Sequence, residues 1–202
     1  LLRGLNSYVG LVRQYPSPFR QEGEPPEARP ARAITQWGGS GMEAIDSRTF
    51  RDTLGQFLTG VTIVTAAAPD GRPVGLTVNS FTSVSLDPPL VLFCIDKGAG
   101  TYEGVVNAQG YAVHILGGDQ VDLANRFAAK GADRFAGINY TRGLHGAPIL
   151  PGAMALLECR TVQRIDAGDH TILVGQVERL DPGSRDRKPL GYFRGRYTAV
   201  AD

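Results

Sequence analysis

The segment from Gly75 to Val91 carries hydroxyl and carboxamide side chains within a run that otherwise has the composition of a β-strand. A strand that only buries itself would have Val, Ile or Leu at several of these positions. Because strand side chains alternate between faces, we expect four polar residues on one face. They are Thr77, Asn79, Ser83 and Ser85. Such neutral donors and acceptors suit a flat ligand with polar edges and a phosphate tail. A half-solvated strand of an antiparallel sheet would show the same pattern.

A loop after the next apolar run offers groups that could bind phosphate. Lys97 is followed by Gly98, Ala99, Gly100 and Thr101. Glycines let backbone N–H groups point at oxygens, and a lysine adds a point charge. Lys97 could equally be a solvated loop charge. The two glycines do not form a dinucleotide fingerprint, because the third glycine and the βαβ context are missing.

His170 and the C-terminal segment hold the remaining candidates. His170 follows the turn Gly168-Asp169, and an imidazole there can donate to a carboxamide or phosphate oxygen. Arg194 and Arg196 can meet a pyrophosphate bidentately, and Tyr197 can cover a ring. From the residues alone, a solvent-exposed turn histidine and an amphipathic edge strand fit these patterns as well.

The composition excludes several classes of function. The chain has 202 residues, a formal net charge of +1 and 20% charged residues of mixed sign. Such a chain is a poor candidate for binding nucleic acid or an acidic membrane, and no apolar run is long enough to span a bilayer. Its histidines and cysteines show no metal-ligand spacing, so we expect no metal site. Cys94 and Cys159 lie in apolar runs, and we expect buried free thiols in a reducing compartment, the cytoplasm.

The chain divides into two parts at about residue 44. Residues 1–44 are rich in Pro, Arg and Gly and show neither helical nor strand periodicity, so we expect a disordered N-terminal extension. Its apolar start is too short and too broken for a signal peptide. Met42 stands just before the recognisable domain and would suit a translation start. Residues 45–202 are long enough for one domain with a core.

Periodicity and turn residues predict a mainly β domain with a few helices. A helix is expected to begin at a cap on Asp46 or Ser47 and to end at Gly60. The apolar residues at helical spacing within it are Phe50, Leu54, Phe57, Leu58 and Val61. Shorter helices are expected at 102–107 and at 119–130, where Phe127 lies on the inner face. Many strands at hairpin spacing indicate an antiparallel barrel. Besides the polar segment, strands are expected at 61–67, 90–95 (buried on both faces), 111–116, 153–165, 170–180 and 190–200.

The polar segment resembles the flavin-binding strand pair of the flavin reductase-like family, the FMN-binding split barrels. Three other stretches match in the family's order: Phe50 to Thr65, Gly168 to Ile172, and Phe193 to Tyr197. The resemblance covers residues 50–200. It implies an antiparallel split β-barrel with a few flanking helices, forming a homodimer whose flavin sites lie near the subunit interface.

The resemblance also implies a reaction and the residues that carry it. The family consists of NAD(P)H:flavin oxidoreductases, typically the reductase half of two-component flavin monooxygenases. It implies hydride transfer from NADH or NADPH to FMN (or FAD), and a separate monooxygenase that receives the reduced flavin. The catalytic role falls to His170, near the nicotinamide. The cofactor-binding residues that it implies are Thr77, Val78, Asn79, Ser80, Ser83, Cys94, Lys97, Gly98, Thr101, Phe127, Arg194 and Tyr197.

The chain departs from the family's usual pattern in the loop after Lys97. Gly98, Ala99 and Gly100 carry no hydroxyl where family members often carry serines, so phosphate affinity would be lower or rest on backbone groups. This would suit a reductase that binds FMN as a substrate and releases it. Two alternatives are a non-catalytic FMN-binding protein and an oxidase of the pyridoxamine-phosphate oxidase type. The choices between NADH and NADPH, and between FMN, FAD and riboflavin, stay open.

Overall fold

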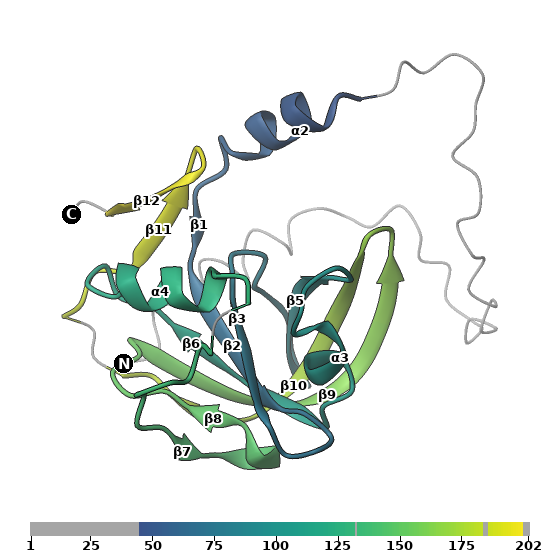
Figure 1. Cartoon of the computed structure of the whole chain (residues 1–202), viewed down its shortest axis with the longest axis vertical. Helices are drawn as coiled ribbons and strands as arrows, with labels where there is room; N and C mark the ends of the chain where they lie inside the picture. The colour runs from purple at the N-terminus through teal and green to yellow at the C-terminus, as the bar shows by residue number, and fades with distance from the viewer. Residues whose placement is uncertain (1–44, 132, 184–185, 200–202) are drawn as a thin grey trace, which may run out of the picture. The chain divides into compact units, whose positions relative to one another are not determined.

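Seven antiparallel strands form the main sheet, in the order β3-β2-β6-β9-β10-β5-β4 (Figure 1). The computed structural model describes residues 45–131, 133–183 and 186–199. The predicted N-terminal extension, residues 1–44, lies outside the described residues. The strands are β2 (Thr62–Ala67), β3 (Pro73–Val78), β4 (Thr82–Leu86), β5 (Pro89–Asp96), β6 (Gly110–Ile115), β9 (Ala155–Ala167) and β10 (His170–Asp181).

The remaining strands of the described residues form two smaller sheets. β1 (Thr59–Gly60), β11 (Leu190–Phe193) and β12 (Arg196–Ala199) form one of them. β7 (Thr141–Arg142) and β8 (Pro148–Ile149) form the other, joined by the 3₁₀ helix η1 (Leu144–Gly146). Backbone hydrogen bonds from Leu190 N to Leu116 O and from Val61 N to Leu190 O tie the three-stranded sheet to the main one.

Among the described residues, three α-helices flank the sheets. α4 (Val121–Ala128) contacts β3 and β2 on one side, and α3 (Tyr102–Val106) contacts the same two strands elsewhere (Figure 1). α2 (Ser47–Leu54) begins at Asp46, whose carboxylate accepts a hydrogen bond from Thr49 N. None of the residues of α2 is buried.

The core has two apolar clusters. One fills the space between the main sheet and α3, around Phe93 and Tyr111, whose rings meet edge to face at 5.0 Å. The other lies beneath α4, around Ile63 and Phe127. Together the two clusters hold β3 between two packed layers. The packing therefore fixes the position of the end of β3, from which the next residues extend.

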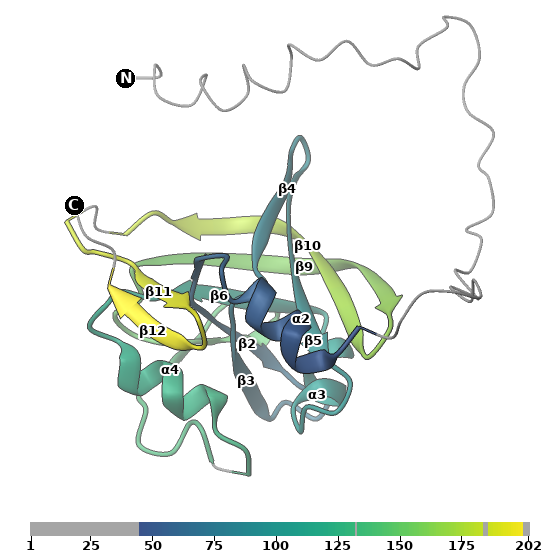
Figure 2. The ribbon, with the colours of Figure 1, turned by 90° about the horizontal axis from the view of Figure 1, so that it is seen from above.

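The two ends of the main sheet approach each other next to the residues after β3. Cys94 N in β5 donates to Ser80 Oγ at 2.9 Å, and Ser80 Oγ donates to Cys94 O at 3.2 Å. Figure 2 shows the β4–β5 hairpin extending beyond the strands next to it. The expectation of a mainly β, antiparallel fold with a few helices is confirmed.

Two expected elements differ in the structure. The first helix is shorter than predicted, because it ends at Gly55 and the chain is already in β1 at Thr59. The single strand expected at 190–200 is a hairpin instead. Arg194 (φ +48°) and Gly195 (φ +76°) form its two-residue loop, and two positive φ angles in sequence are typical of a type I′ turn.

Two expectations about strand faces were also wrong. β5 is not buried on both faces, because Val91, Phe93 and Ile95 are buried while the residues between them are half-exposed. The polar row does not lie on one face of one strand. β3 ends at Val78 and the chain bends before β4, so Thr77 and Ser83 belong to strands at opposite ends of the sheet order.

Candidate functional site

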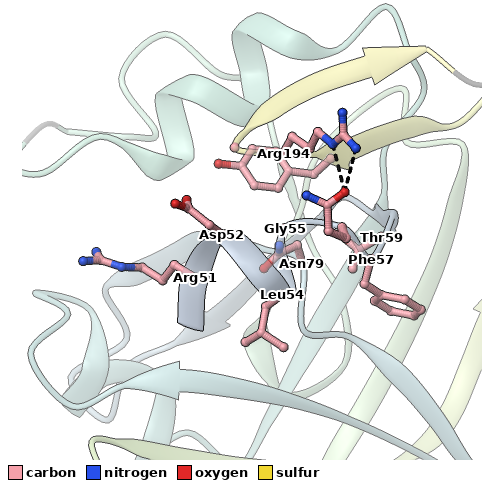
Figure 3. A pocket seen from close by; sticks show the side chains of 11 residues that line it. Arg51, Asp52, Leu54, Gly55, Phe57, Thr59, Asn79 and Arg194 are labelled. Atoms are coloured by element: carbon pink, nitrogen blue, oxygen red, sulfur yellow. Dashed lines mark hydrogen bonds between the residues drawn. The ribbon is translucent and has the colours of Figure 1, made fainter. Parts of the chain in front are cut away.

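A cleft of about 740 Å³ lies between the end of α2, the turn that joins β11 to β12, and the residue that follows β3 (Figure 3). Its floor is apolar and its edges carry amide, hydroxyl and guanidinium groups. Asn79 is exposed at its edge, next to the end of β3. The lining residues are Arg51, Asp52, Leu54, Gly55, Gln56, Phe57, Thr59, Asn79, Tyr192, Arg194 and Gly195.

A smaller cleft of about 200 Å³ shares Asn79 and Tyr192 with the first. Tyr197 also lines it, and the two tyrosine rings meet edge to face at 5.5 Å. Thr77 lines the same cleft, but its hydroxyl donates to Ala124 O in α4 at 2.6 Å. The Thr77 hydroxyl proton therefore holds α4 against β3, while its oxygen can still accept a hydrogen bond.

Arg194 is held in place from three directions. Its backbone N donates to Gly55 O at 2.9 Å, which joins the β11–β12 turn to the end of α2. Its Nε and Nη2 donate to Gln56 Oε1 at 3.0 and 2.7 Å, drawn as dashed lines in Figure 3. The guanidinium also lies 4.9 Å from the centre of the Phe193 ring. Gln56, which orients this cation, carries no signal in the sequence that would have marked it.

The donor set of the two clefts fits a flat ring with polar edges. The Thr59 Oγ1 is buried at the cleft and has no hydrogen-bond partner among the described residues. An unpaired buried hydroxyl is costly unless a ligand or water completes it. Asn79 adds a carboxamide and Tyr192 an aromatic face, all without a net charge. The residues present therefore fit an isoalloxazine ring, whose edge carries both acceptors and a donor.

Two of the proposed cofactor-binding residues lie in the core instead. Phe127 is fully buried, with its ring edge to face against Phe135 at 5.1 Å. Val78 is buried, and its carbonyl oxygen accepts a hydrogen bond from Thr62 Oγ1 at 3.0 Å. In the structure both side chains therefore pack within the core of the chain.

Lys97 and Gly98 have their polar groups engaged within the protein. The Lys97 ammonium forms an ion pair with Asp166 and donates to Gly168 O at 2.7 Å. Asp166 raises the pKa of Lys97, chiefly through their hydrogen bond. Gly98 N donates to Asp96 Oδ1 at 2.7 Å. The ammonium group of Lys97 and the backbone N–H of Gly98 are therefore both bound to carboxylates of the chain.

His170 lies at the start of β10, opposite Asp96 in the β5–β10 register. Its Nδ1 is 2.7 Å from Asp169 Oδ1, and the side chain is 43% exposed. This hydrogen bond to His170 is the main cause that lowers the pKa of Asp169 below its usual range. The imidazole is accessible and oriented by a carboxylate.

The structure brings only part of the predicted set together. Thr77, Asn79, Arg194 and Tyr197 line the two clefts at the end of β3. The other predicted residues line neither cleft. Ser80 and Cys94 hydrogen-bond to each other, and Ser83 is exposed on β4. Thr101 is the N-cap of α3, and the β9–β10 turn lies beside Lys97, Gly98 and His170. Within the described ranges, no group of His, Cys, Asp and Glu side chains could hold a metal ion, and no helix is long and apolar enough to cross a membrane.

Comparison with known proteins identifies the family. A family model described as "Flavin reductase like domain" matches residues 54–201, and the chain belongs to this family. The reductase component of a flavin-dependent trigonelline monooxygenase from Acinetobacter baylyi is 43% identical over 163 residues, which are 80% of this chain and 52% of that protein. The NADH-dependent FMN reductase SmoA of Agrobacterium fabrum is 45% identical over 152 residues, 75% of this chain and 85% of that one.

A solved structure gives the same picture at the level of the fold. The NADH:FAD oxidoreductase SgcE6 of Streptomyces globisporus, in complex with NAD and FAD fragments, superposes with a TM-score of 0.71 at 37% identity. The match covers 79% of this chain and 98% of that one. The expected flavin-reductase fold is therefore confirmed. The chain spans about half the length of two curated relatives, 49% of one from Rhizobium meliloti and 52% of the Acinetobacter protein.

Proposed function

We propose that this chain is an NAD(P)H:flavin oxidoreductase that reduces FMN or FAD. The observation that carries the proposal is the pair of clefts that meet at Asn79 and Tyr192, with the unpaired hydroxyl of Thr59 lining the larger one. When bound, flavin supplies a two-electron acceptor and reduced nicotinamide supplies the hydride. The names of the relatives, an NADH-dependent FMN reductase among them, support this activity.

The protein's own contribution to this reaction would be binding and orientation. Asn79 and Thr59 would hydrogen-bond the ring edge, and Tyr192 would cover part of a ring face. Arg194, fixed by Gln56, would stabilise negative charge that develops on the reduced ring. Hydride transfer needs no protein acid, so positioning of the two rings would account for most of the rate.

The assay is anaerobic oxidation of NADH and of NADPH with FMN, FAD and riboflavin each in excess. Turnover that depends on added flavin would support a reductase of diffusible flavin. Asn79→Ala should then raise the flavin KM or slow reduction, whereas Gln109→Ala, on the exposed loop before β6, should change neither. Flavin binding without turnover on either nucleotide would refute the proposal and favour a non-catalytic flavoprotein.

We propose further that two copies of the chain form a homodimer that covers an apolar face of the main sheet. On β10, His170 and Ile172 point away from the core, because the residues that alternate with them, Thr171 and Leu173, are buried. Ile172 stands opposite Cys94 on β5 and Ile165 on β9. The main contacts of the helices α3 and α4 are with β2 and β3, at the other end of the sheet order from β5 and β10. Monomeric proteins rarely leave such a continuous apolar surface uncovered.

The second copy would bring its own groups towards His170, which lines neither of the two clefts at the end of β3. This would explain how an exposed imidazole could serve the nicotinamide side of the site. Ile172→Asp should yield a monomer by light scattering, with weakened flavin binding, while Gln109→Asp should keep the mass of the wild type. A wild-type protein that is monomeric at micromolar concentration would refute the dimer.

A separate monooxygenase would receive the reduced flavin. The relatives include reductase components of a trigonelline monooxygenase and of a stachydrine N-demethylase, which supports a two-component system. Cys94 and Cys159 are free thiols, and a cytoplasmic setting would keep them reduced. Supply of reduced flavin to an oxygenase added to the assay, measured as product formed per NADH consumed, would test this role.

A further inference from the structure

Residues 141–150, which include β7, η1 and β8, form a strap that contacts β2, β6 and β9 of the main sheet. Each of these three strands contributes one buried polar side chain that hydrogen-bonds to a backbone atom of the strap. In these hydrogen bonds Thr65 Oγ1 donates to Pro148 O (2.5 Å), Leu150 N to His114 Nε2 (3.0 Å) and Leu144 N to Glu158 Oε2 (2.5 Å). Because a buried polar group is costly without a partner, the sheet holds the strap through its backbone.

The strap carries backbone strain at His145, whose φ is +54°. The His145 Nε2 lies 2.8 Å from Glu178 Oε2, and a Cβ on Gly110 would lie 2.4 Å from the His145 Cδ2. Glu178 has no partner in the β9–β10 register, which shifts between Val177 and Arg179. Such a bulge re-aims a side chain, in this case towards His145. The closed strap is therefore held against strain, so its polar contacts decide whether it stays closed.

The contact between the strap and His114 requires a neutral imidazole. The His114 Nε2 accepts from Leu150 N, and the Nδ1 lies 3.1 Å from Ile63 O, to which it must donate. A protonated imidazole has two donors and no acceptor, so it would oppose the Leu150 N–H with a second donor. Protonation of His114 thus removes one of the three hydrogen bonds that hold the strap.

The charged groups around His114 are engaged in ion pairs. From β2 and β8 it meets the neutral backbone atoms already described, and the charge that acts on it is that of Glu158 on β9. The ion pairs are Arg179 with Glu158 (3.1 Å), and His145 and Arg160 with Glu178 (2.8 and 3.0 Å). Burial lowers the pKa of His114 to about 4, although Glu158 raises it. In an open strap the pKa of His114 would return towards 6.5, so the open form takes up a proton and acid favours opening.

The strap also supports the smaller of the two clefts at the end of β3. Leu150 is buried in the same apolar cluster as Ala124 and Phe127 of α4. Ala124 O accepts the hydrogen bond from Thr77, and Ala128 lines the smaller cleft together with Thr77. An open strap would remove Leu150 from beneath α4 and would loosen the packing of α4 against β3.

We propose that the strap is an acid-sensitive conformational switch, which opens as a unit when His114 takes up a proton and thereby loosens the smaller cleft beside α4. The link to flavin rests on the proposed flavin reductase function, whereas the opening itself does not. A flavin that needs the intact cleft binds the closed strap only, so it opposes the opening that acid favours.

Amide hydrogen exchange, measured by NMR without ligand at pH 7.5 and pH 5.5, tests the opening. The amides of Leu144 and Leu150 report on the strap, and that of Leu173 in the middle of β10 reports on global unfolding. After correction for intrinsic exchange, the opening constant of the strap should rise about tenfold in the wild type, because an exposed histidine is mostly protonated at pH 5.5. In His114→Gln it should change less than about twofold, since glutamine offers an acceptor and a donor but does not titrate. His170→Gln, an exposed histidine outside the strap, should keep the tenfold rise.

Thr65→Val and bound FMN complete the test. Thr65→Val removes a strap contact that does not titrate, so the strap should open more at both pH values and keep its tenfold pH ratio, even if His114→Gln does not fold. FMN at about 100 times its Kd should lower the opening constant by up to about 100-fold.

The possible results separate the strap from the proposed function. Strap amides that exchange no faster than that of Leu173, or a pH ratio that persists in His114→Gln, would overturn the switch. FMN that binds, as seen by its fluorescence, without slowing exchange in the strap would overturn the link to the cleft. A protein that binds no flavin, and whose strap still opens in acid, would overturn the flavin reductase function alone.

Discussion

His114 should make the fold sensitive to mild acid. The side chain is fully buried in β6, and its Nε2 accepts a hydrogen bond from Leu150 N at 3.0 Å. Its Nδ1 lies 3.1 Å from Ile63 O and must donate to it. One ring nitrogen accepts while the other donates, so the contacts require the neutral imidazole. Burial lowers the pKa of His114 to about 4, and this outweighs the hydrogen bond to Ile63 and the charge of Glu158, which raise it.

The magnitude follows from proton linkage. In the unfolded chain this histidine has a pKa of 6.5, the value before burial acts on it. Between pH 6.5 and 4 the unfolded state binds a proton that the native state does not, so the free energy of unfolding falls as the pH falls. At 1.36 kcal/mol for each pH unit, the loss is about 2 kcal/mol at pH 5 and about 3 kcal/mol at pH 4. Typical domains have only about 5–15 kcal/mol in total.

Urea unfolding at pH 7.5 and pH 5.0 measures this loss. The wild type should lose more stability than His114→Gln between these two values, by about 2 kcal/mol, because the glutamine cannot titrate. His145→Gln is a matched control, since His145 is partly exposed and forms its ion pair with Glu178 at the surface. Equal losses in the wild type and His114→Gln, or an imidazole that titrates near pH 6.5 in the native protein, would refute the reasoning.

Three further substitutions have definite outcomes. Phe127→Ala should cost about 3–5 kcal/mol, seen as a lower urea midpoint, because the ring is fully buried; a small cost with a large loss of flavin affinity would instead place it at the ligand. Gly175→Ala should destabilise by roughly 1–3 kcal/mol or more, since its Cβ would lie 2.2 Å from the Tyr111 hydroxyl; an unchanged melting temperature would contradict that packing. Lys97→Met should leave the Kd of FMN nearly unchanged, because Asp166 already neutralises the ammonium; a large selective loss for FMN over riboflavin would return the phosphate to this lysine.

Local patterns were sufficient for most of the elements but not for their ends. The turn at Asp70-Gly71 and the long β9–β10 hairpin follow from glycine and alternating side chains. The C-terminal hairpin was missed because Arg194 occupies a position of positive φ that asparagine or aspartate more often fills. The first helix was extended too far, because Phe57 and Leu58 continue its apolar spacing. They are exposed beyond its end rather than packed on it.

The polar segment predicted a common strand face that the structure does not have. Period-two spacing predicts a common face only while one strand continues. The chain bends after Val78, so Thr77 turns its hydroxyl towards α4 and Ser83 moves to another strand. Asn79 is left at the bend, where the two clefts meet. The type of residue was informative here, whereas its orientation depended on contacts that form across the sheet.

Charge balance shows most clearly why the site could not be derived from the sequence alone. The sequence left Lys97 open between a phosphate ligand and a solvated loop charge, and in the structure it forms an ion pair with Asp166, on a strand far along the chain. Arg134, which the sequence analysis did not single out, donates to the carbonyl oxygens of Gly75 and Ala129. None of the ion pairs found within the described residues includes it. Whether a cation can bind a ligand depends on the partners that folding gives it. These partners come from long-range contacts, which local sequence patterns do not show.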